Sequence, residues 1–182
     1  MEIWRNVWEE KKLGQRLSIL KMKIYTLGTS NRPLNEFLEI LRKYQIETVV
    51  DVRYFPTSKL FPHFKKENLE KFLKENKIEY YYIEKLGGYR KGGYEEYTKT
   101  KEFEEGLEEL IKISKLRNLV IICAEKLPWK CHRAFITKKL EEKGIKVIHI
   151  IEKDRIWEPK EEPKEIKPTC QKAKFLKKLN NK

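Results

Sequence analysis

The sequence lacks the features that would place the chain in a membrane, in a disulfide scaffold or on a secretory route. Only three of its 182 residues are cysteine, too few and odd in number for a disulfide framework. No uncharged apolar run approaches the roughly 20 residues of a membrane-spanning helix. The first twenty residues mix charges with Trp4 and Trp8, unlike a signal peptide. We therefore expect a cytoplasmic protein with reduced thiols and no membrane partner.

Aspartate and glutamine are also scarce. The chain has 2 Asp and 3 Gln against 26 Glu and 32 Lys. This composition is typical of proteins from very hot environments, although a genome of low GC content would have the same effect. The formal net charge of +13 favours anionic partners, either a small molecule or a nucleic acid. The composition indicates no particular cofactor and no oligomeric state.

Three regions follow from the pattern along the chain. Residues 1–21 form a charged N-terminal extension whose residues suit a helix, and Met22 is an alternative start. Residues 22–151 carry the alternating apolar pattern of a folded domain. Residues 152–182 are rich in Lys, Glu and Pro and predict a basic tail.

Short apolar runs alternate with helical spacing through the central region. Strands are predicted at 23–27, 48–52, 79–83, 119–122 and 146–151, and helices in between. This alternation predicts an α/β fold, a three-layer Rossmann-like domain with a mostly parallel five-stranded sheet. We expect the strand order 3-2-1-4-5, with 2-1-3-4-5 as the alternative.

Ligands of such sheets bind outside the carboxyl ends of the strands, so the composition of the loops that follow the first four strands bears on function. These loops span 28–33, 53–66, 84–93 and 123–133. Their eleven Lys and Arg against two acids make a net charge of +9, and they hold four of the nine Arg and five of the eight Gly. Arg grips phosphate through two parallel hydrogen bonds, and Gly allows close backbone approach. The loops therefore predict an electropositive pocket.

Individual residues receive roles from this pattern. Arg53 and Arg133 are expected to clamp the anion, with hydrogen-bond donors or close backbone approach from the remaining ligand-binding candidates: Gly28, Ser30, Asn31, Gly87, Gly88, Arg90 and His132. The catalytic candidates are Asp51, Cys123 and Glu125. Asp51 fits a direct catalyst and an orienting partner of Arg53 equally well.

The segment from Cys123 to Arg133 supports three interpretations. Cys131 begins a helix, where the dipole lowers a thiol pKa, so a reactive thiol is one of them. Cys123, Cys131 and His132 would suit a metal, but no second ligand pair follows, so no metal site is predicted. In the third interpretation the thiols are inert, with Cys123 packed as a small buried hydrophobic residue and Cys131 helping to cap the helix. We expect Cys123 and Glu125 to matter more than Cys131.

Four motifs together resemble the domain-of-unknown-function family number 488. They are Gly28-Thr-Ser-Asn-Arg32, Asp51-Val-Arg-Tyr-Phe-Pro-Thr-Ser58, Leu86-Gly-Gly88 and Cys123-Ala-Glu-Lys-Leu-Pro-Trp-Lys-Cys-His-Arg133. The resemblance covers about residues 22–151 and implies a Rossmann-like fold with the site in these loops. The family usually has His where this chain has Thr29, which argues against a mechanism that needs His there.

Two functions remain open on the sequence alone. The first is a small enzyme that binds a phosphorylated or nucleotide-like ligand in the electropositive pocket. The alternative is a non-enzymatic nucleic-acid-binding module, in which the basic loops and the tail follow the phosphates. A pocket requires Arg53 and Arg133 to be buried together, whereas a binding surface requires a broad exposed basic face.

Overall fold

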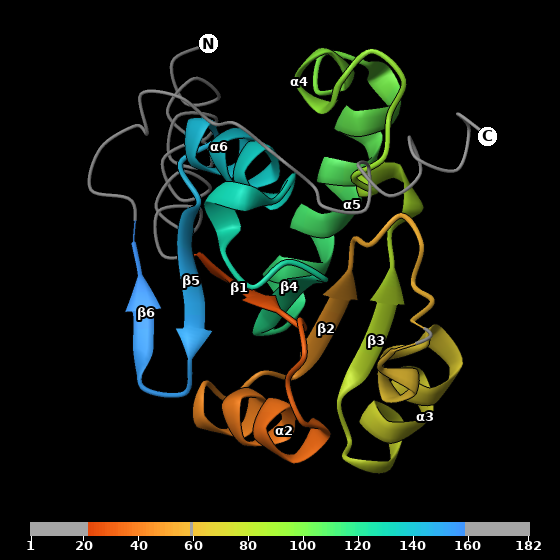
Figure 1. Ribbon diagram of the computed structural model, residues 1–182. Coiled ribbons are helices and arrows are strands. Elements are labelled where there is room, and N and C mark those ends of the chain that lie inside the picture. The colour runs from red at the N-terminus through yellow and green to blue at the C-terminus, as the bar shows by residue number, and fades with distance from the viewer. Residues whose placement is uncertain (1–21, 59, 159–182) are drawn as a thin grey trace, which may run out of the picture.

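The computed structural model describes residues 22–58 and 60–158, which form a twisted sheet with helices on both faces (Figure 1). The predicted N-terminal extension and the end of the predicted tail lie outside these residues. None of the described helices is both long and apolar enough to cross a membrane.

The elements follow the predicted alternation. The strands are β1 Lys23–Gly28, β2 Thr48–Asp51, β3 Glu79–Tyr82, β4 Leu119–Cys123, β5 Lys146–Glu152 and β6 Arg155–Trp157. The helices are α2 Leu34–Lys43, α3 Lys66–Glu75, α4 Tyr94–Tyr97, α5 Lys101–Leu116 and α6 Arg133–Glu142. Three short 3₁₀ turns join them: η1 Pro62–Phe64, η2 Glu84–Leu86 and η3 Pro128–Lys130.

The strand order is β3-β2-β4-β1-β5-β6, so both predicted orders are wrong. β4 pairs in parallel with β2 on one side and with β1 on the other, and it separates the two strands that were expected to be neighbours. All five residues of β4 are buried, as expected of a central strand between two layers of helices. The ends of β1, β2 and β4 therefore meet at the middle of the sheet.

The sheet has six strands, one more than predicted. β6 pairs antiparallel with β5 and lies within the residues that the sequence assigned to the tail. The strand is only three residues long and two of these are exposed, so it lacks the apolar run that marks the other strands.

Two apolar layers hold the sheet between its helices. α2 and α3 cover one face, and α5 and α6 cover the other (Figure 1). Neighbouring strand residues such as Val49 and Val50 are both buried, because each face of the sheet has its own core. The mostly parallel three-layer α/β fold predicted from the sequence is confirmed.

Candidate functional site

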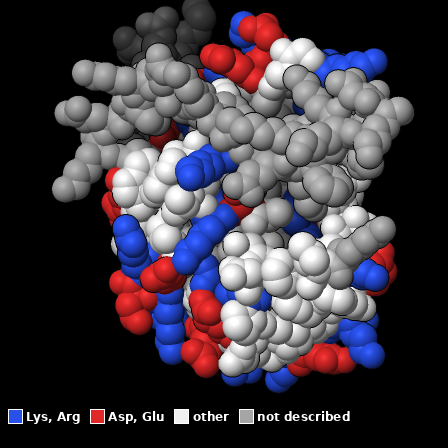
Figure 2. Space-filling view, in the orientation of Figure 1, with Lys and Arg blue, Asp and Glu red and all other residues white. Residues whose placement is uncertain are grey.

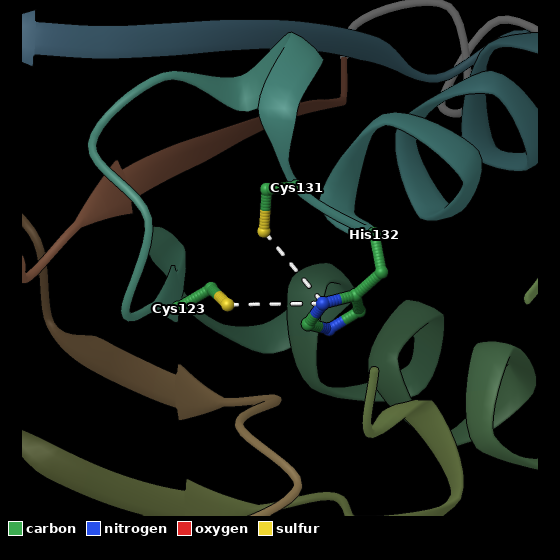
Figure 3. Close-up of side chains that lie close together, drawn as sticks. All are labelled: Cys123, Cys131 and His132. Atoms are coloured by element: carbon green, nitrogen blue, oxygen red, sulfur yellow. Dashed lines mark hydrogen bonds between the residues drawn. The ribbon is translucent and has the colours of Figure 1, made fainter. Parts of the chain in front are cut away.

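Two cysteines and a histidine converge at the carboxyl end of β4. Cys123 is the last residue of β4, whereas Cys131 and His132 follow the η3 turn and precede α6. The Nδ1 atom of His132 lies 3.7 Å from Sγ of Cys123 and 3.6 Å from Sγ of Cys131 (Figure 3). All three residues are buried. We call them the Cys–Cys–His centre.

The loops after β2 and β3 hold the imidazole of His132 in place. Its Nε2 atom lies 3.0 Å from the carbonyl oxygen of Val52, which can only accept a hydrogen bond, so Nε2 carries the proton. The lone pair of Nδ1 then faces the two sulfur atoms. Gly88 packs against the same ring, because a Cβ atom there would lie 2.3 Å from Nδ1. Only glycine permits this approach.

Arg133 supports the centre from the first turn of α6. The side chain is buried, and its Nε donates to Sγ of Cys131 over 3.4 Å. Its other nitrogens donate to the hydroxyl of Thr26 and to the carbonyl oxygen of Glu125. Arg133 therefore positions Cys131 and joins the loop after β4 to β1, and its role in binding a ligand anion stays a prediction.

The two thiols differ in acidity. The interaction with Cys131, together with burial, raises the pKa of the Cys123 thiol well above its ordinary value. Burial also opposes ionisation of Cys131, but the hydrogen bond from the Cys123 thiol and the guanidinium of Arg133 outweigh it and hold the pKa of Cys131 well below its ordinary value. Without a further ligand, Cys131 is thus the thiol that ionises first.

Asp51 and Arg53 form a buried ion pair beside the centre. Nε of Arg53 lies 2.9 Å from both carboxylate oxygens of Asp51, and Nη1 donates to the carbonyl oxygen of Phe64. The hydroxyl of Tyr80 donates to the same carboxylate over 2.8 Å. Burial lowers the pKa of Arg53, but the pairing with Asp51 outweighs it and raises that pKa overall. This geometry favours Asp51 as an orienting partner, and the expected anion clamp of Arg53 stays untested.

Three aromatic rings gather where the loops after β2 and β3 meet. The ring of Tyr54 lies 4.6 Å from that of Phe55 and 5.5 Å from that of Tyr89, centroid to centroid. Phe55 and Tyr89 are each 48% exposed. The guanidinium of Arg90 lies over the ring of Tyr54, 5.2 Å from its centroid. We call Tyr54, Phe55 and Tyr89 the aromatic cluster.

The remaining candidates lie around these two features. Gly28 abuts the loop after β4, because a Cβ there would lie 2.2 Å from the carbonyl oxygen of Glu125. A small pocket beside the end of β1 is lined by Ser30, Asn31, Arg32, Pro33, Glu36 and Lys126. Gly87 packs against Tyr54. Glu125 is half-buried in the loop after β4, and its carbonyl oxygen accepts from Arg133.

The structure brings Cys131 to the same imidazole as Cys123, although Cys131 was expected to have the smaller role. Cys131 was expected to cap α6 or to pack, yet the N-cap residue is His132, without a side-chain cap, and Cys131 points at the imidazole. Tyr54 and Tyr89 stand out in the sequence as rings in or beside the basic loops, where aromatic residues among cations suit base stacking, whereas Phe55 was not singled out. Two of the three members of the aromatic cluster occupy the Asp51–Ser58 motif, and the third follows Leu86-Gly-Gly88, which is a signal that could have found the whole cluster.

One protein family matches the chain. Its description is "Domain of unknown function DUF488", and the match spans residues 33–140, more than half of the sequence. The matched region contains the Cys–Cys–His centre, the Asp51–Arg53 pair and the aromatic cluster. No curated protein and no solved structure matches the chain.

Proposed function

The chain therefore belongs to the DUF488 family, and on that premise we propose that it is a cytoplasmic enzyme that acts on a nucleotide-like ligand at the Cys–Cys–His centre. The aromatic cluster takes the base of this ligand, and the reacting group lies towards the centre. Free thiols at Cys123 and Cys131 suit the reducing cytoplasm expected from the cysteine count.

The proposal rests on one observation, which is that the partly exposed aromatic cluster adjoins the buried Cys–Cys–His centre. Tyr89 directly follows Gly88, which packs on the ring of His132. Tyr54 comes two residues after Val52, whose carbonyl oxygen accepts from His132. A ligand that stacks on the exposed rings is thus anchored by the same two loops that hold the imidazole. Bases of every kind stack on exposed aromatic rings, because each has a π-face.

The small pocket beside β1 supplies groups for an anion. The hydroxyl of Ser30, the amide of Asn31 and the ammonium of Lys126 line it and are hydrogen-bond donors. The guanidinium groups of Arg53 and Arg133 are already bonded within the protein. The ammonium of Lys126 also pairs with Glu152, over 2.7 Å, but this pair is exposed, whereas both arginines are buried. Lys126 and the neutral donors are therefore better placed than the arginines to meet a phosphate from solvent.

Binding of adenosine 5′-monophosphate tests the proposal, with ribose 5-phosphate and adenosine as its two halves. Replacing Phe55 or Tyr89 with Ala should weaken adenosine 5′-monophosphate binding by about 1–3 kcal/mol, or roughly 5- to 150-fold in Kd, by titration calorimetry. Tyr81→Ala removes another exposed ring, 40% exposed on β3, and should leave the affinity unchanged. Equal affinity of the wild type for ribose 5-phosphate and the nucleotide would exclude base recognition.

The nucleic-acid alternative keeps some support from the same cluster and from the net charge of +13. On the face drawn in Figure 2, however, Lys and Arg side chains alternate with Asp and Glu, which suits a small ligand better than a long polyanion. If the protein does bind single strands, affinity should fall by orders of magnitude between about 50 and 200 mM salt for six or more phosphate contacts. A truncated chain that ends at Glu158 keeps β6 and should lose much of the affinity for single strands. Salt-independent binding would contradict this alternative.

A further inference from the structure

The ligand atoms of the Cys–Cys–His centre have the spacing of a tetrahedral zinc site. With Zn–S bonds of about 2.3 Å and a Zn–N bond of about 2.0–2.1 Å, tetrahedral angles place sulfur about 3.5 Å from nitrogen and about 3.8 Å from the second sulfur. The measured distances from Nδ1 to the two sulfurs are 3.7 and 3.6 Å. All three ligand atoms lie within 4.8 Å of one another. A metal ion fits between them with only small shifts.

The surroundings already orient the ligands as a metal site requires. His132 donates Nε2–H to a backbone carbonyl, so Nδ1 is the available ligand atom, and metal-binding histidines almost always have such a partner. Nε of Arg133 approaches Sγ of Cys131 to 3.4 Å. An N–H group aimed at sulfur stabilises a thiolate that would otherwise be buried without a donor.

The donor set selects the kind of metal. Two thiolates and one imidazole are ligands for zinc and other borderline or soft ions, whereas Mg²⁺ and Ca²⁺ require oxygen. The two thiolate charges neutralise a divalent ion, which reduces the cost of placing it among buried residues. Within residues 22–58 and 60–158, no fourth His, Cys, Asp or Glu joins the three. Three protein ligands with one open position is the pattern of catalytic zinc.

We infer that Cys123, Cys131 and His132 bind one zinc ion, which leaves a coordination position for water or substrate. This inference rests on the proposed function, because it assigns a zinc ion to the Cys–Cys–His centre of the proposed enzyme. Metal binding itself requires neither the aromatic cluster nor a nucleotide. It replaces the expectation from the sequence that no metal is bound. That expectation depended on the lack of a second ligand pair, which a catalytic site does not need.

Titration of the full chain with Co²⁺ alone tests the metal site directly. After removal of bound metal by a chelator under reducing conditions, one equivalent of Co²⁺ should produce a sulfur-to-metal charge-transfer band and the intense visible bands of a four-coordinate ion. Zn²⁺ should abolish both bands, since it binds thiolate sites more tightly than Co²⁺. If one equivalent of Co²⁺ produces no charge-transfer band, the inference is wrong.

Matched variants identify the ligands. Cys123→Ser and Cys131→Ser should each reduce the charge-transfer intensity to roughly half or less, because one of two thiolates is lost. The third cysteine of the chain provides the control, and Cys170→Ser should leave the spectrum unchanged. An unchanged spectrum in both Cys123→Ser and Cys131→Ser would overturn the assignment.

Two further measurements test the site when a serine variant does not fold and separate metal binding from the proposed function. If a serine variant fails to fold, zinc must instead protect Cys123 and Cys131 of the wild type from alkylation, read by mass spectrometry, and equal labelling with and without zinc would overturn the site. The Phe55→Ala/Tyr89→Ala variant should bind Co²⁺ as the wild type does. Nucleotide binding and metal binding can therefore fail separately.

Discussion

Replacing Asp51 with Asn is expected to lower the free energy of unfolding by about 3–5 kcal/mol. The carboxylate is fully buried and accepts hydrogen bonds from Arg53 and from the hydroxyl of Tyr80. The amide keeps the shape but removes the charge, so the guanidinium of Arg53 remains buried without its counter-ion. Guanidinium denaturation followed by circular dichroism should show a lower midpoint.

Two controls separate this ion pair from surface charge and from catalysis. Glu96→Gln removes an exposed partner of Lys99 and should leave the midpoint unchanged. The double variant Asp51→Asn/Arg53→Met should recover much of the lost stability, because a buried apolar chain needs no partner. If Asp51→Asn were as stable as the wild type yet failed to turn over ligand, Asp51 would be a catalyst and not an orienting residue.

The second large effect is a loss of stability in acid that depends on His149. Nδ1 of this histidine lies 2.7 Å from the hydroxyl of Thr26, which also accepts from Arg133. A neutral imidazole with its proton on Nε2 can accept the hydroxyl proton of Thr26 at Nδ1, and the low pKa of His149 keeps the ring neutral at pH 7. Burial and the charge of Arg133 lower the pKa of His149 to about 3, while the thiolate of Cys131 acts in the opposite direction.

The sign of the pH effect follows from this depressed pKa. Above about pH 6.5 the imidazole is neutral in both the folded and the unfolded chain and contributes no pH dependence. As the pH falls below 6.5, His149 binds a proton in the unfolded chain, whereas in the folded chain it binds one only at about pH 3. His149 should therefore cost about 3 kcal/mol of stability between pH 7 and pH 4, at about 1.4 kcal/mol per unit.

The His149→Asn variant isolates this contribution. Its amide oxygen can accept from the hydroxyl of Thr26 but does not titrate. Free energies of unfolding measured at several pH values should therefore fall less steeply for the variant than for the wild type below pH 6.5. Parallel curves for the two proteins would show that His149 is protonated equally in both states.

Most elements of the fold are predictable because they depend on local patterns. The first five strands lie within one residue of their predicted bounds, since each is a short apolar run between polar turns. β6 was missed because it has only Ile156 and Trp157 as apolar residues. It is a strand because its backbone pairs with β5, and this pairing cannot be seen in the local sequence. The strand order was also missed. β1, β4 and β5 all have nearly continuous apolar runs, so nothing local says which two of them are neighbours.

The candidate site was predictable in position but not in its internal pairing. The rule that parallel sheets bind ligands at the carboxyl ends of strands led to the loops that hold the Cys–Cys–His centre and the aromatic cluster, and the Cys123–Arg133 motif contains the whole centre. The expected clamp of Arg53 and Arg133 treated both as free cations. Burial requires each guanidinium to have partners within the protein, and Arg53 takes Asp51, whereas Arg133 takes Thr26 and the loop after β4.

By itself, the sequence determined that this chain is an α/β domain of the DUF488 family, because strand runs, helical spacing and motif residues are local properties. Only the tertiary structure decided that Cys123, eight residues before Cys131, shares one imidazole with it. That contact depends on the η3 turn, on the carbonyl oxygen of Val52 from another strand end, and on Gly88 from a third. Groups from three loops meet only because β4 pairs with β2 and β2 pairs with β3, which places the carboxyl ends of these three strands side by side. The local sequence pattern does not encode such long-range pairing.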